Sequence, residues 1–270
     1  MLGAQSYAKI TMGRGGVGGG GRASRRSGSS AAITSKLTLP WMTSTSSLGL
    51  FGLTTGLTAY VGIFCVYSSK APRKGETVII TDATSAVGSI AAQLAKTTGA
   101  TVIGISSNKK SKSYLMNDLE LDGAIIYNSN NDIDQETVVE DQLESICPRG
   151  VDFVFDNVGG EILDTVLNHI RPKARVVICD AVSQYETSKT TGPSNYLKLV
   201  QQGAEMKGFT VFQYTRRIPA AVFFLWWYSL RGKVKMTESI HEGIKSFPLA
   251  LQTTLRLDDN RNIGKTLVVL

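Results

Sequence analysis

Residues 77–89 read TVIITDATSAVGS, and this stretch decides the fold class. Its first five residues, TVIIT, are β-branched, which is typical of a strand buried on both faces of a sheet. From Ala86 onward the side chains are small or apolar, which favours a helix that packs closely on that strand. A buried strand that runs through a short turn into a helix is the first half of a βαβ unit.

Strand-like and helical runs alternate from this stretch to residue 179. The strand-like runs are TVIIT, TVIGIS, AIIY, VDFVFD and RVVIC, and helical patterns lie between them at 87–98, 110–116, 136–145 and 161–169. Strands that are apolar throughout belong to parallel sheets with helices on both faces. The sequence therefore predicts an α/β domain with a doubly wound, Rossmann-like parallel sheet.

The turn at 82–88 departs from the usual glycine pattern of a nucleotide-binding βαβ unit. The spacing G-x-x-G-x-x-G would place glycine at 82, 85 and 88, but only Gly88 is present, with Asp82 and Ser85 at the other positions. Ser85 can replace a glycine if its φ is negative. We expect Asp82 to turn its carboxylate away and cap the following helix, because a carboxylate beside a diphosphate is costly. The amides at the helix N-terminus can still bind an anion, so both a nucleotide-binding turn and a plain structural turn remain open.

The residues after the second strand bear on which dinucleotide would bind. A site that prefers NAD places Asp or Glu about 20 residues after the turn to hold the ribose hydroxyls. Here TVIGIS is followed by Ser107, Asn108, Lys109, Lys110 and Lys112. Hydroxyls and cations at this place suit a 2′-phosphate, and a solvated lysine cluster at a helix start is the alternative.

The net charge of +7 belongs to the N-terminal segment. Residues 1–75 hold nine Lys or Arg and no acidic residue, which leaves 20 basic and 22 acidic residues for the remainder. The remainder therefore lacks the basic surface that nucleic acid requires, and no nucleic-acid partner is expected. The cysteines and histidines show no C-x-x-C or H-x-x-x-H spacing, so neither a metal site nor a disulfide framework is predicted.

Residues 1–47 are rich in Gly, Ser and Arg and poor in large apolar side chains. We expect a disordered leader there, followed by one domain over 48–270 that ends in a C-terminal return segment. The basic, acid-free leader fits an organelle transit peptide as well as a low-complexity tail. A cytoplasmic location is expected, with an organelle as the alternative.

Two apolar segments raise the question of a membrane. Residues 48–67 are uncharged and long enough to span a bilayer, but glycines and threonines dilute their hydrophobicity. A helix buried against the sheet is the favoured interpretation, and no membrane partner is expected. Residues 220–230, with the run AVFFLWWYSL, are too short to span and predict a heavily buried helix or a partner-facing patch.

Several motifs occur in order over about 220 residues. They are GLTAY at 56–60, AVGS at 86–89, VDFVFDNVGGEILD at 151–164, VSQY at 182–185, GPSNY at 192–196, KGFTVFQY at 207–214 and NIGK at 262–265. With these motifs, the chain resembles the zinc-independent medium-chain dehydrogenase/reductases, and within them the prostaglandin reductase and 2-alkenal reductase family. The resemblance implies NADP(H) as cofactor and reduction of the carbon-carbon double bond of α,β-unsaturated aldehydes or ketones.

The resemblance also implies a set of site residues. Tyr185 is the implied hydrogen-bond donor or proton source for the enolate, with a tyrosine that only packs on the ribose as the alternative. Where the family carries a lysine for the 2′-phosphate, this chain has Ser111, flanked by Lys110 and Lys112. The other implied cofactor contacts lie on the turns after the strands: Ala86, Val87, Gly88, Ser89, Tyr127, Asn157, Cys179, Ser183, Phe209, Thr210, Val211 and Asn262. His169 and His241, on predicted helices, are not expected to be catalytic.

Family members begin with a β-rich substrate-binding domain, which residues 1–47 do not resemble. Two functions are therefore expected as alternatives. One is a reductase that is impaired by the missing domain or completed by another chain. The other is an NADP(H)-binding remnant that serves as a binding or assembly module. The sequence also leaves a homodimer open.

Overall fold

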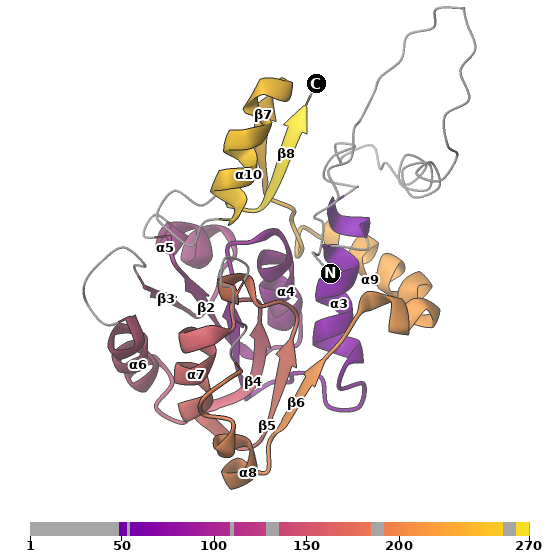
Figure 1. The fold of residues 1–270 in the computed structure, drawn as a ribbon. Helices are drawn as coiled ribbons and strands as arrows, with labels where there is room; N and C mark the ends of the chain where they lie inside the picture. The colour runs from indigo at the N-terminus through magenta and orange to yellow at the C-terminus, as the bar shows by residue number, and fades with distance from the viewer. Residues whose placement is uncertain are drawn as a thin grey trace, which may run out of the picture.

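The computed structural model describes residues 49–52, 55–108, 111–127, 135–184, 192–255 and 263–269. The leader predicted at 1–47 lies outside these residues. A six-stranded parallel sheet forms the centre, with strand order β3-β2-β1-β4-β5-β6 (Figure 1). This order confirms the predicted doubly wound sheet. The strands are β1 (Thr77–Thr81), β2 (Thr101–Ser106), β3 (Gly123–Ile126), β4 (Val151–Asp156), β5 (Ile170–Ile178) and β6 (Glu205–Gly208).

Alternate side chains of β1 enter two separate cores on opposite faces of the sheet. Val78 and Ile80 pack with α3 (Gly56–Tyr60) and α4 (Ala86–Thr97), whereas Ile79 packs with α6 (Gln135–Ile146) and α7 (Gly160–Asn168). Figure 1 shows α3 and α4 on one side of the sheet and α6 and α7 on the other. Burial on both faces explains why β1 is apolar and β-branched throughout. Two short helices, α5 (Ser111–Ser113) and α8 (Leu197–Gln202), lie between strands.

Within the apolar segment 48–67, residues Gly56–Cys65 form a buried helix, as the sequence predicts. Helix α3 continues through one π-helical turn, Val61–Cys65, and Leu57, Ala59 and Ile63 are at most 2% exposed. Within the described residues, no helix is both long and apolar enough to cross a bilayer. The second apolar segment forms α9 (Ile218–Leu230), but only Ala221 and Leu225 of this helix are fully buried. The sequence left a heavily buried helix and a partner-facing patch open, and the structure describes a helix with one buried side and one exposed side.

The C-terminal return segment forms a small unit beside the main sheet. Strands β7 (Glu238–Glu242) and β8 (Lys265–Val269) pair in parallel, and α10 (Phe247–Leu255) connects them. His241 lies in β7, so its predicted helical position was wrong: the strand pairing with β8 determines the conformation there. The backbone N–H of Gly264 donates to the carbonyl of Thr84 at 2.7 Å, which ties the return segment to the turn after β1.

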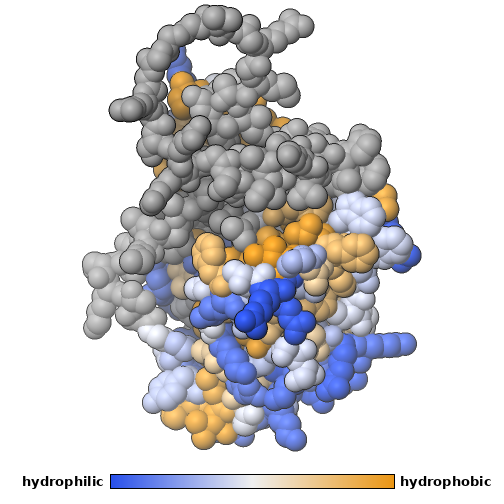
Figure 2. Space-filling view, turned by 90° about the vertical axis from the view of Figure 1, so that its right-hand side faces the viewer, coloured by the Kyte–Doolittle hydropathy of each residue, from blue (hydrophilic) through white to orange (hydrophobic). Residues whose placement is uncertain are grey.

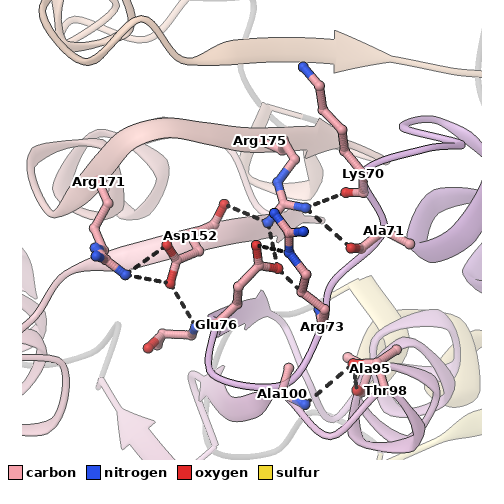
Figure 3. A network of polar contacts seen from close by, with 11 residues as sticks. Lys70, Ala71, Arg73, Glu76, Ala95, Thr98, Ala100, Asp152, Arg171 and Arg175 are labelled. Atoms are coloured by element: carbon pink, nitrogen blue, oxygen red, sulfur yellow. Dashed lines mark hydrogen bonds and ion pairs between the residues drawn. The ribbon is translucent and has the colours of Figure 1, made fainter.

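A buried ion pair fixes the amino ends of the strands (Figure 3). The Arg175 guanidinium lies 2.7 Å from the Glu76 carboxylate and also donates to the backbone carbonyls of Lys70 and Ala71. Burial alone would raise the pKa of Glu76, but the hydrogen bond and charge of Arg175, with help from Arg73, outweigh it and hold that pKa below its ordinary value. The network joins the segment before β1 to β5.

Replacing Arg175 with Met should lower the free energy of unfolding by about 3 kcal/mol, because it removes the buried partner of the Glu76 carboxylate and leaves only the exposed Arg73 beside it. The matched control is Arg171→Met, which breaks the ion pair with Asp152 at 2.9 Å. The Arg171 side chain is 43% exposed, so this loss should cost about 1 kcal/mol or less. Urea denaturation of both variants checks the prediction, and equal losses would contradict it.

Candidate nucleotide-binding site

The turn after β1 begins α4 with a serine cap. Ser85 is the N-cap residue, with φ −69° and ψ 169°, and its Oγ accepts from the N–H of Gly88 at 3.1 Å. The same hydroxyl donates to the carbonyl of Asp82 at 2.9 Å. The φ of Ser85 is negative, which meets the condition for serine to replace glycine at this position. The N-terminus of α4 is well ordered for binding an anion.

Asp82 does not serve as the N-cap of α4, so that prediction was wrong. Its φ is 50°, in the left-handed region where glycine is favoured and where Asp is tolerated better than most other residues. The turn requires this conformation at the position where the usual motif has its first glycine. Since the helix starts at Ala86, the residue correctly spaced to cap it is Ser85.

Gly88 has the role of the third glycine of the usual motif, which is close packing of the helix on the turn. A Cβ at Gly88 would lie 2.2 Å from the backbone oxygen of Asp82, so no larger residue fits without movement. The N–H groups of Gly88 and Ser89 are bonded to the side chain and backbone of Ser85. The donors expected to face an anion are thus those of Ala86 and Val87, which occupy first-turn positions.

The turn after β4 is held by a buried carboxylate. Asp156 is 0% exposed and accepts from the Thr81 hydroxyl at 2.7 Å and from the N–H groups of Val158 at 3.3 Å and Gly159 at 2.9 Å. Burial raises the pKa of Asp156 to about 6, although these hydrogen bonds favour the ionised form. Gly159 and Gly160 follow with φ of 68° and 57°, which turns the chain sharply into α7.

Asn157 connects β1 to β4 at the switch point, the place in the sheet where the strand order reverses direction. Its N–H donates to Thr81 Oγ1 and its Nδ2 donates to the Thr81 carbonyl, both at 2.8 Å. Asn157, a predicted cofactor contact, therefore has a structural role in this structure, because its hydrogen bonds join the end of β4 to the end of β1. Asp156 and Thr81 were missed by the sequence analysis. The available signal was a polar residue at the C-terminal end of each of two mainly apolar strand runs, VDFVFD and TVIIT.

The segment after β5 lies against the turn after β4. Ser183 donates from its N–H at 3.1 Å and from its hydroxyl at 2.6 Å to the carbonyl of Val158. Burial raises the pKa of the Cys179 thiol, and the nearby Asp180 and Asp156 carboxylates raise it further, so the thiol stays protonated. Cys179 and Ser183 thus follow β5, and Ser183 contacts the turn after β4. Tyr185, the predicted proton source, lies outside the described residues.

The end of β2 is filled by small polar side chains. The Ser106 hydroxyl lies 3.1 Å from that of Thr84 and accepts from the Ser111 hydroxyl at 3.0 Å. Ser111, where the family carries its lysine, is fully buried, whereas Lys112 is exposed. Lys110 lies outside the described residues. The N–H of Tyr127 donates to the Ser106 carbonyl at 3.1 Å, which places Tyr127 at the same edge of the sheet.

Phe209, Thr210 and Val211 follow β6 at this edge as well. Thr210 and Gln213 form a reciprocal capping box, and Val211 is 9% exposed. Asn262 lies outside the described residues. The predicted residues that the structure describes therefore follow the carboxyl ends of the strands, where ligands bind in doubly wound sheets.

Two further features of the described residues bear on where the site lies and what it holds. A cavity of about 480 Å³ lies at the opposite, amino edge of β4 and β5, where Cys147, Gly150, His169 and Arg171 are among its lining residues. It is therefore separate from the switch point. Among the described residues, no group of three or more His, Cys, Asp or Glu side chains is placed to hold a metal ion.

The fold is a nucleotide-binding fold of the Rossmann type. Its strand order reverses direction between β1 and β4, and a capped helix N-terminus lies at that point. The chain belongs to the zinc-binding dehydrogenase family, whose sequence pattern matches residues 86–227, more than half of the chain.

Individual relatives are reductases. The chain is 36% identical over 223 residues to (+)-pulegone reductase of Mentha piperita, covering 83% of this chain and 61% of that protein. It is 34% identical over 222 residues to the NADP+-dependent 2-alkenal reductase of Nicotiana tabacum, covering 82% and 61%. The crystal structure of CurA from Vibrio vulnificus in complex with NADPH matches with a TM-score of 0.72 and 28% identity, over 83% of this chain and 64% of CurA. The chain thus spans about three fifths of the length of these curated relatives.

The raised pKa of Asp156 predicts a pH-dependent stability. Because the folded-state pKa of about 6 lies above the ordinary value of 3.8, the contribution of Asp156 is fully present below the ordinary value and is lost as pH rises through 6. Two pKa units correspond to about 3 kcal/mol. The unfolding free energy of the wild type minus that of Asp156→Asn should therefore fall by about 3 kcal/mol between about pH 3 and about pH 7.

Urea denaturation across this pH range measures the difference. Asp141→Asn, an exposed position on α6, provides the baseline. If the difference between the wild type and Asp156→Asn does not change with pH, the buried carboxyl group does not titrate as described.

Proposed function

We propose that the chain binds NADP(H) at the carboxyl edge of its sheet and contributes the cofactor-binding part of a reductase for α,β-unsaturated aldehydes or ketones. The observation that carries the proposal is the N-terminus of α4, capped by Ser85 and packed through Gly88 at the switch point. Two of the relatives named above are reductases. One of these reductases is NADP+-dependent, and the CurA structure contains NADPH. The N-terminus of a helix suits a diphosphate, so the residues present fit this cofactor.

Different residues of the chain bind different parts of the cofactor. The N–H groups of Ala86 and Val87 bind the pyrophosphate, and the buried Asp156 keeps the neighbouring turn in place. Lys112, with Lys110, supplies positive charge for the 2′-phosphate. No acidic residue occurs between the end of β2 and Lys112, so nothing in that segment repels a phosphate.

The residues after β5 act at the reacting end. NADPH supplies a hydride for the β-carbon of the conjugated substrate. Tyr185, two residues after Ser183 in the sequence, is the proposed donor of a hydrogen bond to the enolate oxygen or of a proton to the α-carbon. The Cys179 thiol, protonated throughout the physiological range, takes no part as a nucleophile.

Cofactor preference follows from the charges after β2. Charge-assisted hydrogen bonds to a 2′-phosphate contribute about 1.5 to 3 kcal/mol each, so NADPH should bind at least about tenfold more tightly than NADH. Lys112→Gln should reduce this preference and leave the NADH affinity unchanged. Titration of intrinsic fluorescence gives both dissociation constants. Equal affinities for the two cofactors in the wild type would refute the preference.

The reaction itself is tested by following NADPH absorbance with a reactive enal. We expect enal-dependent oxidation that falls by about 100-fold in Tyr185→Phe, because a positioned proton donor contributes at least that much. The NADPH dissociation constant should stay the same in this variant. Tight NADPH binding without any oxidation would instead favour the alternative of a binding module, and the absence of NADPH binding would refute the whole proposal.

A further inference from the structure

Helix α9 is apolar on every side although one side has no cover among the described residues. Its thirteen residues, IPAAVFFLWWYSL, include no charged side chain. The inner side is well packed: Ala221 and Leu225 are at most 1% exposed, and the ring of Phe224 lies 5.1 Å from that of Phe64 of the π-helical turn after α3. A helix that is hydrophobic all round is normally buried all round.

The outer side of α9 carries a stripe of large apolar side chains. Phe223 is 64% exposed, Trp227 37% and Leu230 43%, and their spacing of four and three residues places them on one side of the helix. Phe212, on the turn that precedes α9, is 69% exposed. Figure 2 views this side of the molecule, where hydrophobic and hydrophilic residues lie next to each other. We call these four residues the aromatic stripe.

Positive charges lie at both ends of helix α9. Residues 211–236 contain no Asp or Glu. The Arg231 guanidinium lies 4.1 Å from the centre of the Trp227 ring, so cation and aromatic ring share one surface. All five basic residues of this segment are exposed, two before α9 and three after it: Arg216, Arg217, Arg231, Lys233 and Lys235.

We propose that the aromatic stripe and its five flanking cations dock on the surface of an anionic lipid bilayer. Aromatic side chains favour the boundary between headgroups and acyl chains, and lysine and arginine favour anionic headgroups. Helix α9 is too short to span a bilayer, so the contact is peripheral. A second copy of the chain fits less well, because a two-fold contact through α9 would bring these cations against one another.

Co-sedimentation of the 270-residue chain with vesicles tests the proposal. Vesicles of phosphatidylcholine with about 30% phosphatidylserine should bind the chain, and pure phosphatidylcholine should bind it at least about tenfold more weakly. A Phe223→Ser, Trp227→Ser double variant should lose at least about tenfold in affinity for the anionic vesicles. An Arg216→Gln, Arg217→Gln double variant should lose about tenfold or more, since each cation near such a surface contributes about fivefold.

The matched control is Val200→Ser, which removes an apolar side chain that is 76% exposed on α8 and should leave vesicle binding unchanged. All substituted side chains are solvent-exposed or partly so, and unchanged circular dichroism confirms that the variants fold. Failure of the wild type to bind anionic vesicles, or equal binding by wild type and both double variants, overturns the proposal. A dimer in analytical ultracentrifugation that Phe223→Ser, Trp227→Ser dissociates would assign the stripe to a second copy and overturn it as well.

Discussion

The carboxylate of Asp156 stabilises the junction between β1 and β4, from which the two halves of the sheet extend. Strands β1 and β4 pair in register only from Val78 with Phe153 to Ile80 with Phe155. Beyond that point the side chains of Thr81 and Asp156 continue the connection through a 2.7 Å hydrogen bond. A fully buried carboxylate is costly, and here three hydrogen-bond donors offset part of its desolvation. The turns that follow β1 and β4 are fixed relative to each other as a result.

The turn after β1 reaches a nucleotide-binding geometry with one glycine in place of three. The left-handed conformation needed at the first position is adopted by Asp82, with φ 50°. The middle position keeps a negative φ, which allows Ser85 to cap α4. Only at Gly88 does contact with the backbone of Asp82 exclude a side chain. Backbone amides at a helix N-terminus, more than glycines themselves, are what a phosphate requires.

Local patterns were sufficient to predict the sheet, because hydrophobic periodicity acts over short stretches of chain. The cap of α4 was assigned to Asp82 wrongly, since propensity makes Asp and Ser equally good caps and only the helix start distinguishes them. The bond between Thr81 and Asp156 joins residues 75 apart in sequence, so it depends on β1 and β4 being neighbours in the sheet. Composition also cannot tell whether an apolar helix such as α9 is covered on both sides.

Amide hydrogen exchange with and without NADPH tests most directly whether the carboxyl edge of the sheet binds the cofactor. The account predicts that NADPH slows exchange in residues 82–89, 156–160 and 179–184, which follow β1, β4 and β5 at that edge. Residues 147–150 and 168–172, which line the cavity at the amino edge, should exchange at unchanged rates. Protection confined to the amino edge, or no protection in the turn at 82–89, would contradict the account.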